Sequence, residues 1–249
     1  MSHRPPFVLL HGWACPTSTW RPVAERLRAA GCRVDVPALL GYGSAGTETD
    51  EAGWTLEAAA HDVARLLAGL GAPAVVVGHS LGGSVAATLA VLHPELVAGV
   101  GFVGMVPVAP GATTSARLTE LFLQPDSQPT PEAIGMCLAA WYREPPTDPD
   151  VLAELESAFH APGPVLKGSL RAALTGVAPE VPGQIEAPVA VVLGGGDRTR
   201  PREEVEQLLG AHPGWSRTIV PGAGHMVQWE APGECAAALL AGPWSPTRQ

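Results

Sequence analysis

The sequence predicts an α/β protein with a mostly parallel central sheet, and two observations support this. Short, nearly continuous apolar runs alternate with segments whose apolar residues recur at helical spacing. Apolar residues also make up 46% of the 249 residues and charged residues only 16%, which is enough apolar material for one sizeable core. A parallel sheet with both faces covered by helices accounts for both observations.

Four strands are expected in the first half of the chain. The most β-branched run, residues 74–77, is the strongest of them, and the others cover 7–10, 33–36 and 97–106. Helices are expected between these strands, at 18–30, after the capping residue Thr55 as far as Gly71, and at 81–92.

Residues 111–184 interrupt this alternation of strands and helices. Helical segments are expected there at 115–123, 131–141, 148–160 and 164–174, separated by proline-rich joints and with no convincing strand. Strands return at 188–193 and 216–220, with helices at 202–209 and 231–240. We therefore expect an α/β core formed by 1–110 and 185–249, with 111–184 inserted as a helical cap after the strand that ends near Val106.

Composition and charge argue against several classes of protein. The net charge of −9 and the lack of a basic stripe argue against binding to nucleic acid. The four cysteines are scattered without metal-ligand spacing, and no apolar run is long enough for a membrane span. We expect a cytoplasmic protein with reduced thiols, no membrane association, no metal and no cofactor, and we leave its oligomeric state open.

Residues 78–82 read GHSLG and match the pattern G-x-S-x-G. The pattern follows a strong strand and opens a helix, which is the setting that a nucleophilic serine requires. There the turn holds Ser80 in a strained conformation at a helix N-terminus. The alternative is a glycine-rich turn with a serine helix cap, and the strand, the helix and a further glycine at 83 favour the nucleophile.

A serine nucleophile needs a base and an acid, and the chain places candidates after two later strands. Asp197 follows the strand at 188–193, and His225 follows the strand at 216–220. The chain order Ser80, Asp197, His225 is the order that this motif requires. Turn formation by Asp197 and capping by His225 remain the alternatives. The other histidines considered lie in or beside helices or before a strand: His61, His93, His160 and His212.

The backbone after the first strand completes the predicted site. Residues 11–13 read HGW, and the backbone N–H groups of Trp13 and Leu81 are the candidate donors of an oxyanion hole.

These motifs resemble those of the α/β-hydrolase superfamily, in particular its small capped carboxylesterase-like members. The resemblance is carried by HGW at 11–13, GHSLGG at 78–83, GGGD at 194–197 and GH at 224–225, and it spans the chain outside the cap. The early HGW is similar to that of pimeloyl-carrier-protein methyl ester esterases. The resemblance implies the α/β-hydrolase fold and a small ester or thioester substrate, either free or presented on a carrier protein.

The leading hypothesis is hydrolysis of a carboxylic ester or thioester of a small to medium, largely apolar acyl group through an acyl-enzyme. Carbon–carbon bond hydrolysis, perhydrolysis and biosynthetic acyl transfer or cyclisation use the same three residues and stay open. A non-catalytic ligand receptor is a further alternative. Epoxide hydrolases and haloalkane dehalogenases need an aspartate where Ser80 stands.

Candidate pocket residues come mainly from the cap. The apolar or amphipathic candidates are Trp13, Met105, Phe122, Met136, Trp141, Tyr142 and Met226. Basic candidates for an anionic carrier are Arg117, Arg143, Lys167 and Arg171, for which solvent exposure is the favoured expectation. Arg198 and Arg200 follow the candidate acid and could reach the mouth of the pocket, although a surface position is again favoured.

Overall fold

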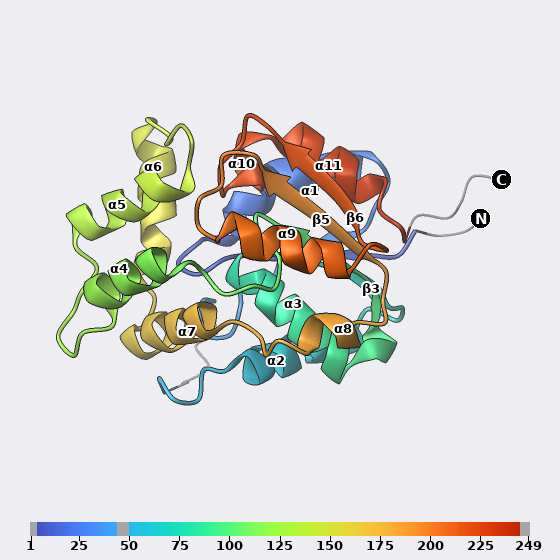
Figure 1. Ribbon diagram of the computed structural model, residues 1–249, viewed down its shortest axis with the longest axis horizontal. Coiled ribbons are helices and arrows are strands. Elements are labelled where there is room, and N and C mark those ends of the chain that lie inside the picture. Colours follow the sequence, from blue (N-terminus) through green and yellow to red (C-terminus); the bar gives the residue numbers. More distant parts are fainter. Residues whose placement is uncertain (1–3, 44–49, 245–249) are drawn as a thin grey trace.

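The computed structural model describes residues 4–43 and 50–244, and within them six strands form one sheet (Figure 1). The sheet order is β2-β1-β3-β4-β5-β6, and every neighbouring pair is parallel, which confirms the expected architecture. The strands are β1 (Phe7–Leu10), β2 (Val34–Asp35), β3 (Ala74–His79), β4 (Val97–Val103), β5 (Val189–Gly194) and β6 (Ser216–Val220).

Helices bury both faces of β1, β3, β4 and β5, whereas four of the five residues of edge strand β6 are exposed. Successive side chains of each strand point to opposite faces of the sheet. Val75 and Val77 of β3 belong to one hydrophobic cluster, whereas Ala74 and Val76 belong to the other. Figure 1 shows α1 and α11 on one side of the sheet and α2 and α3 on the other. The flanking helices are α1 (Arg21–Ala29), α2 (Leu56–Ala68), α3 (Leu81–Leu92), α9 (Arg202–Ala211), α10 (Val227–Glu230) and α11 (Pro232–Leu240).

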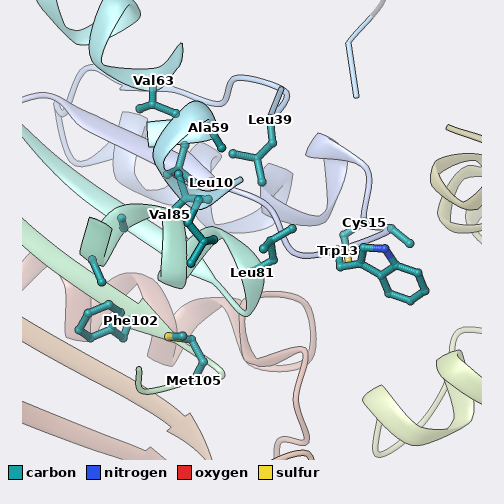
Figure 2. Packing of buried hydrophobic residues seen from close by; sticks show 14 of the residues in the cluster. Leu10, Trp13, Cys15, Leu39, Ala59, Val63, Leu81, Val85, Phe102 and Met105 are labelled. Carbon is teal, nitrogen blue, oxygen red and sulfur yellow. The ribbon is translucent and has the colours of Figure 1, made fainter. Parts of the chain in front are cut away.

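Helix α3 begins two residues after the end of β3, at the carboxyl edge of the sheet. Its apolar side chains Leu81 and Val85 pack near Leu10 of β1, and Phe102 of β4 lies on the same face (Figure 2). Trp13 belongs to the same hydrophobic cluster and lies on the side of the cluster toward the helices that follow β4. The core thus holds the first turn of α3 against the end of β1.

The segment between β4 and β5 is helical, although these two strands are neighbours in the sheet. Figure 1 shows α4, α5 and α6 at one end of the molecule, away from the two termini. Helix α8, by contrast, packs against α3 of the core. The elements are α4 (Ala112–Phe122), α5 (Pro131–Trp141), α6 (Pro149–Ser157), α7 (Gly163–Thr175) and α8 (Val181–Gln184), with a 3₁₀ turn at Ala158–His160.

Several of these boundaries follow from local chemistry. The Thr55 and Thr130 side chains cap α2 and α5 by accepting hydrogen bonds from Ala58 N and Ala133 N, at 3.0 and 3.2 Å. Strand β4 ends at Val103, earlier than expected, because Gly104 adopts a positive φ of 61° and turns the chain out of the sheet. In the described residues, no helix combines the length and hydropathy needed to cross a membrane.

Candidate active site

Ser80 occupies the single position between β3 and α3, at the carboxyl edge of the sheet. Its φ of 50° and ψ of −117° lie in a region that non-glycine residues rarely adopt. Such a conformation costs about 1–3 kcal/mol and persists only where the surrounding structure enforces it. Glycine at position 78 permits this tight turn, since a Cβ there would overlap the backbone of Gly82 and Gly83. The strand–turn–helix junction therefore holds the serine at the first turn of α3.

Asp197 and His225 meet beside this turn. Asp197 follows β5, His225 follows β6, and the His225 Nδ1–H donates to Asp197 Oδ2 at 2.8 Å. The His225 side chain is only 4% exposed and that of Asp197 12% exposed. With Nδ1 occupied by the carboxylate, the lone pair of Nε2 is the one that can accept a proton.

The environment of Asp197 keeps this carboxylate ionised. Burial by itself raises the pKa of Asp197, but the attraction of His225 and hydrogen bonds from His225 and Thr199 outweigh burial and leave the pKa below its ordinary value. A carboxylate that stays charged can hold the imidazole in one tautomer and stabilise the imidazolium form.

Two strained backbones flank the candidate oxyanion hole. Ala14, directly after Trp13, has a φ of 46°, and Ser80, directly before Leu81, has a φ of 50°. In the part of the chain that the structure describes, no hydrogen bond uses the N–H of Trp13 or of Leu81. Both donors are thus free to bind a developing oxyanion.

His11 fixes the loop that carries Trp13. Its Nδ1–H donates to Gly12 O at 2.8 Å, and its Nε2 accepts from Leu39 N at 3.0 Å. Burial lowers the pKa of His11 to about 4, although the hydrogen bond to Gly12 opposes this shift. His11 is therefore a neutral structural link between the loops after β1 and β2, rather than a proton carrier.

Ser80 and His225 line one narrow pocket, which encloses about 40 Å³ of free space. Its walls are mainly apolar and come from the loop after β1 and from α4, α5 and α7. The other lining residues are Trp13, Cys15, His79, Pro110, Thr114, Leu118, Trp141, Leu170, Ala173, Leu174, Thr199 and Arg200. An apolar acyl chain next to Ser80 suits these walls.

Cys15 and His79 line the pocket but are poorly suited to the roles of nucleophile and base. Burial, with a smaller contribution from the Cys137 thiol, raises the pKa of the Cys15 thiol to about 12, so little thiolate exists at neutral pH. Burial and the neighbouring His225 hold the pKa of His79 well below its ordinary value. Its ring packs against His225 with centroids 4.7 Å apart and supports that side chain sterically.

Of the apolar pocket candidates, the structure places Trp13 and Trp141 in the pocket and the others elsewhere. Phe122 packs behind Trp13, with ring centroids 5.0 Å apart, and Met136 lines a separate surface hollow on α4 and α5. Tyr142 is buried next to the end of α5, and its hydroxyl has no partner in the described residues.

Met105 and Met226 are core residues. Met105 packs against Gly83 and lies near Phe102 (Figure 2), and the Met226 sulfur is 4.0 Å from the Gln228 amide nitrogen. Both side chains are 1% exposed. They fill the interior beneath the site instead of facing a ligand.

The structure places the basic candidates in different surroundings. Lys167 donates to two backbone carbonyls, Gln124 O and Pro125 O, and Arg171 pairs with Glu51 at 2.7 Å. Arg117 and Arg143 are exposed. Arg198 is exposed as expected, whereas Arg200 lines the pocket.

Sequence reasoning did not select Thr199 or Glu230. Thr199 binds Asp197 Oδ1 through both its backbone N–H and its hydroxyl, each at 2.8 Å. Glu230 accepts from Gly224 N at 2.8 Å and from Arg143 N at 2.6 Å, so it joins the His225 loop to the end of α5. The signal for Thr199 was its place two residues after the candidate acid, whereas Glu230 had no signal that the sequence could show.

The fold and this arrangement define a class of protein. The model of the alpha/beta hydrolase family matches residues 7–238. This chain belongs to the alpha/beta hydrolase family.

Particular relatives match part of the chain. A pimeloyl-[acyl-carrier protein] methyl ester esterase of Aromatoleum aromaticum is 44% identical over 105 residues, which cover 42% of this chain and 39% of that protein. Epoxide hydrolase B of Mycobacterium tuberculosis is 38% identical over 97 residues, which cover 39% of this chain and 27% of that protein. These matches span less than half of the relatives' own length.

Similarity to solved structures extends over almost the whole chain. A thermophilic esterase from Thermogutta terrifontis superimposes with a TM-score of 0.80 at 24% identity, covering 96% of this chain and 89% of that one. At this identity the likeness shows a shared fold.

Proposed function

We propose that this chain is a serine hydrolase that cleaves a carboxylic ester or thioester through an acyl-enzyme. One observation carries the proposal: His225, hydrogen-bonded to Asp197, lines the same pocket as Ser80, which is held at positive φ. A paired acid and imidazole beside a strained serine is the arrangement that activates a hydroxyl nucleophile.

In the proposed mechanism Ser80 Oγ attacks the acyl carbonyl while His225 Nε2 takes its proton. Asp197 holds the imidazole through Nδ1 and stabilises its positive charge. The N–H groups of Trp13 and Leu81 stabilise the oxyanion. His225 then protonates the leaving alcohol or thiol, and a water activated by the same histidine releases the acid from Ser80.

The substrate is proposed to be a small to medium acyl ester whose chain lies against Trp13 and Trp141. The apolar walls of the pocket support this polarity. Presentation on a carrier protein is a narrower proposal, supported by the name of the Aromatoleum aromaticum relative. An epoxide hydrolase mechanism is less well supported, since Ser80 occupies the position that an aspartate would need.

The test combines labelling and kinetics. Wild-type protein should react with a fluorophosphonate probe at Ser80 and hydrolyse p-nitrophenyl butyrate. Ser80→Ala should abolish labelling and lower kcat by about 10³–10⁶-fold, because removing a member of such a unit leaves only residual catalysis. Ser157→Ala is the matched control, since Ser157 is exposed on α6 and should leave both measurements unchanged.

Two outcomes would contradict the proposal. A wild-type protein that neither labels nor hydrolyses any ester would show that Ser80 is not activated. Hydrolysis unchanged in Ser80→Ala would place the chemistry elsewhere. If esters react, mass spectrometry of products formed in ¹⁸O water separates hydrolysis from acyl transfer, because only hydrolysis adds the label to the released acid.

A further inference from the structure

Arg200 supplies a permanent positive charge in a pocket that is otherwise mostly apolar. It follows Asp197 by three residues and lines the pocket together with Ser80 and His225. Among the described residues that line this pocket, it is the only lysine or arginine. Its side chain is half-buried, and cations that are partly removed from water are usually paired.

The protein provides hydrogen-bond acceptors for only some of the N–H donors of the Arg200 guanidinium. Its Nε–H donates to Val108 O at 2.9 Å, which holds the side chain against the loop after β4. Within the described part of the chain, Arg200 forms no ion pair with an aspartate or glutamate. An arginine has five N–H donors, so the two terminal nitrogens keep four of them for a ligand.

Arg200 stays charged despite its surroundings. Burial lowers the pKa of the Arg200 guanidinium to about 10, and the Asp197 carboxylate partly opposes the shift. At neutral pH the group is still protonated. A neutral acyl chain that filled the pocket would remove water from this charge without replacing its hydrogen bonds, which is unfavourable.

A carboxylate on the substrate would resolve this mismatch. The planar guanidinium matches a carboxylate with two parallel hydrogen bonds, and such charged bonds are stronger than neutral ones. The apolar lining residues Trp141, Leu170 and Leu174 suit the methylene chain that would link the two ends of the substrate.

We propose that Arg200 is a specificity-determining residue that makes the pocket select esters carrying a second, free carboxylate, such as the monoesters of dicarboxylic acids. This inference rests on the proposed serine hydrolase function. The guanidinium binds the free carboxylate while Ser80 attacks the ester carbonyl at the other end. The reaction releases the alcohol and leaves a dicarboxylic acid.

The test compares two substrates that differ in one charge. Monomethyl adipate carries a free carboxylate, and dimethyl adipate is its neutral counterpart. For each, methanol release gives kcat and KM. Wild-type protein should prefer the monoester by about 10–100-fold in kcat/KM, the range expected for charge-assisted hydrogen bonds. Monoesters of succinic to suberic acid then identify the chain length that fits.

Substitutions assign the preference to Arg200. Arg200→Gln should lower kcat/KM for the monoester by about 10–100-fold, mainly through KM, and change the diester by less than about 3-fold. Arg200→Lys should retain part of the preference, because it keeps the charge but loses the bidentate geometry. Arg198→Gln is the matched control, since this neighbouring arginine is exposed, and it should leave both substrates unchanged.

Different results separate the two proposals. Equal losses for both esters in Arg200→Gln would show a structural role, and a wild-type enzyme that does not prefer the monoester would also overturn the inference. Fluorophosphonate labelling of Ser80 and turnover of p-nitrophenyl butyrate would still support the proposed function in those cases. If wild-type protein neither labels nor hydrolyses any ester, both proposals fail together.

Discussion

Thr199 Oγ1 lies 2.8 Å from Asp197 Oδ1, while Asp197 Oδ2 accepts the hydrogen bond from His225 at the same distance. The Thr199 backbone N–H donates to Oδ1 as well, at 2.8 Å. One carboxylate oxygen is therefore committed to Thr199 and the other to His225. This division fixes the rotation of the carboxylate, and through it the direction of the imidazole ring.

Thr199→Val should lower kcat for p-nitrophenyl butyrate by about 10-fold with little change in KM. The substitution removes the hydroxyl but keeps the backbone bond, so Asp197 loses part of its orientation and of the stabilisation of its charge. Thr199→Ser restores the donor and should recover most of kcat. Wild-type kcat in the valine variant would show that the backbone bond alone holds the carboxylate.

Glu230 should matter for catalysis although it lies outside the pocket. Its carboxylate accepts from Gly224 N and Arg143 N, and His225 N donates to Trp141 O at 2.9 Å. Glu230→Gln replaces one accepting oxygen with an NH₂ group that faces a backbone N–H, which should loosen the His225 loop.

We expect Glu230→Gln to lower kcat by about 3–30-fold and to destabilise the fold by about 1–2 kcal/mol. Steady-state kinetics and urea unfolding measure the two effects. Glu234→Gln on α11 is the control, since that side chain is exposed and should be neutral. If the two variants have the same kcat and the same free energy of unfolding, the link between the His225 loop and α5 does not contribute to catalysis or stability.

The core elements could be predicted from the sequence because their signals are local. Ser80 and Asp197 follow buried apolar strands, whereas His225 follows β6, an edge strand with four of its five residues exposed. Helices α8 and α10 were not predicted, since four residues are too few to show a helical period.

The pocket walls could not be predicted in the same way, because they depend on how the helices between β4 and β5 pack on the core. Met136 and Trp141 both belong to α5, and both are large and apolar. Five residues place them on different faces of the helix, so Trp141 lines the pocket and Met136 lines a separate hollow. The sequence shows the two faces but not which one meets Ser80. Arg200 was assigned to the surface for the same reason.

Stability should fall as the pH is lowered from 7 to 5. Burial holds the pKa of His11 at about 4, against an ordinary value of 6.5, so below pH 6.5 the unfolded chain binds a proton that the folded chain does not. The stabilisation is complete above pH 6.5 and is lost progressively toward pH 4. His11 alone should cost about 2 kcal/mol between pH 7 and pH 5, and His79, whose pKa is also lowered, acts in the same direction.

Urea unfolding at pH 7, 6 and 5 measures this dependence. A free energy of unfolding that is constant across the three pH values would contradict it. His11→Gln should be less stable at pH 7, because it disturbs the hydrogen bonds with Gly12 and Leu39. The same variant should also show a shallower pH dependence, which separates the titration of His11 from the effect of net charge.

Gly82 in the first turn of α3 lies close against the backbone at the end of β1. A Cβ there would overlap Leu10 O and lie 2.6 Å from His11 O, and both are backbone atoms that cannot rotate away. Gly82→Ala should therefore push the start of α3 away from the loop that carries Trp13, which separates the two candidate oxyanion donors. We expect kcat to fall at least 10-fold and stability to fall by about 1–3 kcal/mol.

Gly135 on α5 is the matched control, because a Cβ there would meet nothing within 4 Å. Gly135→Ala should raise the free energy of unfolding by about 0.5–1 kcal/mol through helix propensity and leave kcat unchanged. The two alanine substitutions should therefore change the free energy of unfolding in opposite directions. Gly82→Ala could instead be as stable and as active as Gly135→Ala. That result would show that the backbone accommodates the extra methyl group without moving either oxyanion donor, so the close approach of α3 to β1 does not set the oxyanion geometry.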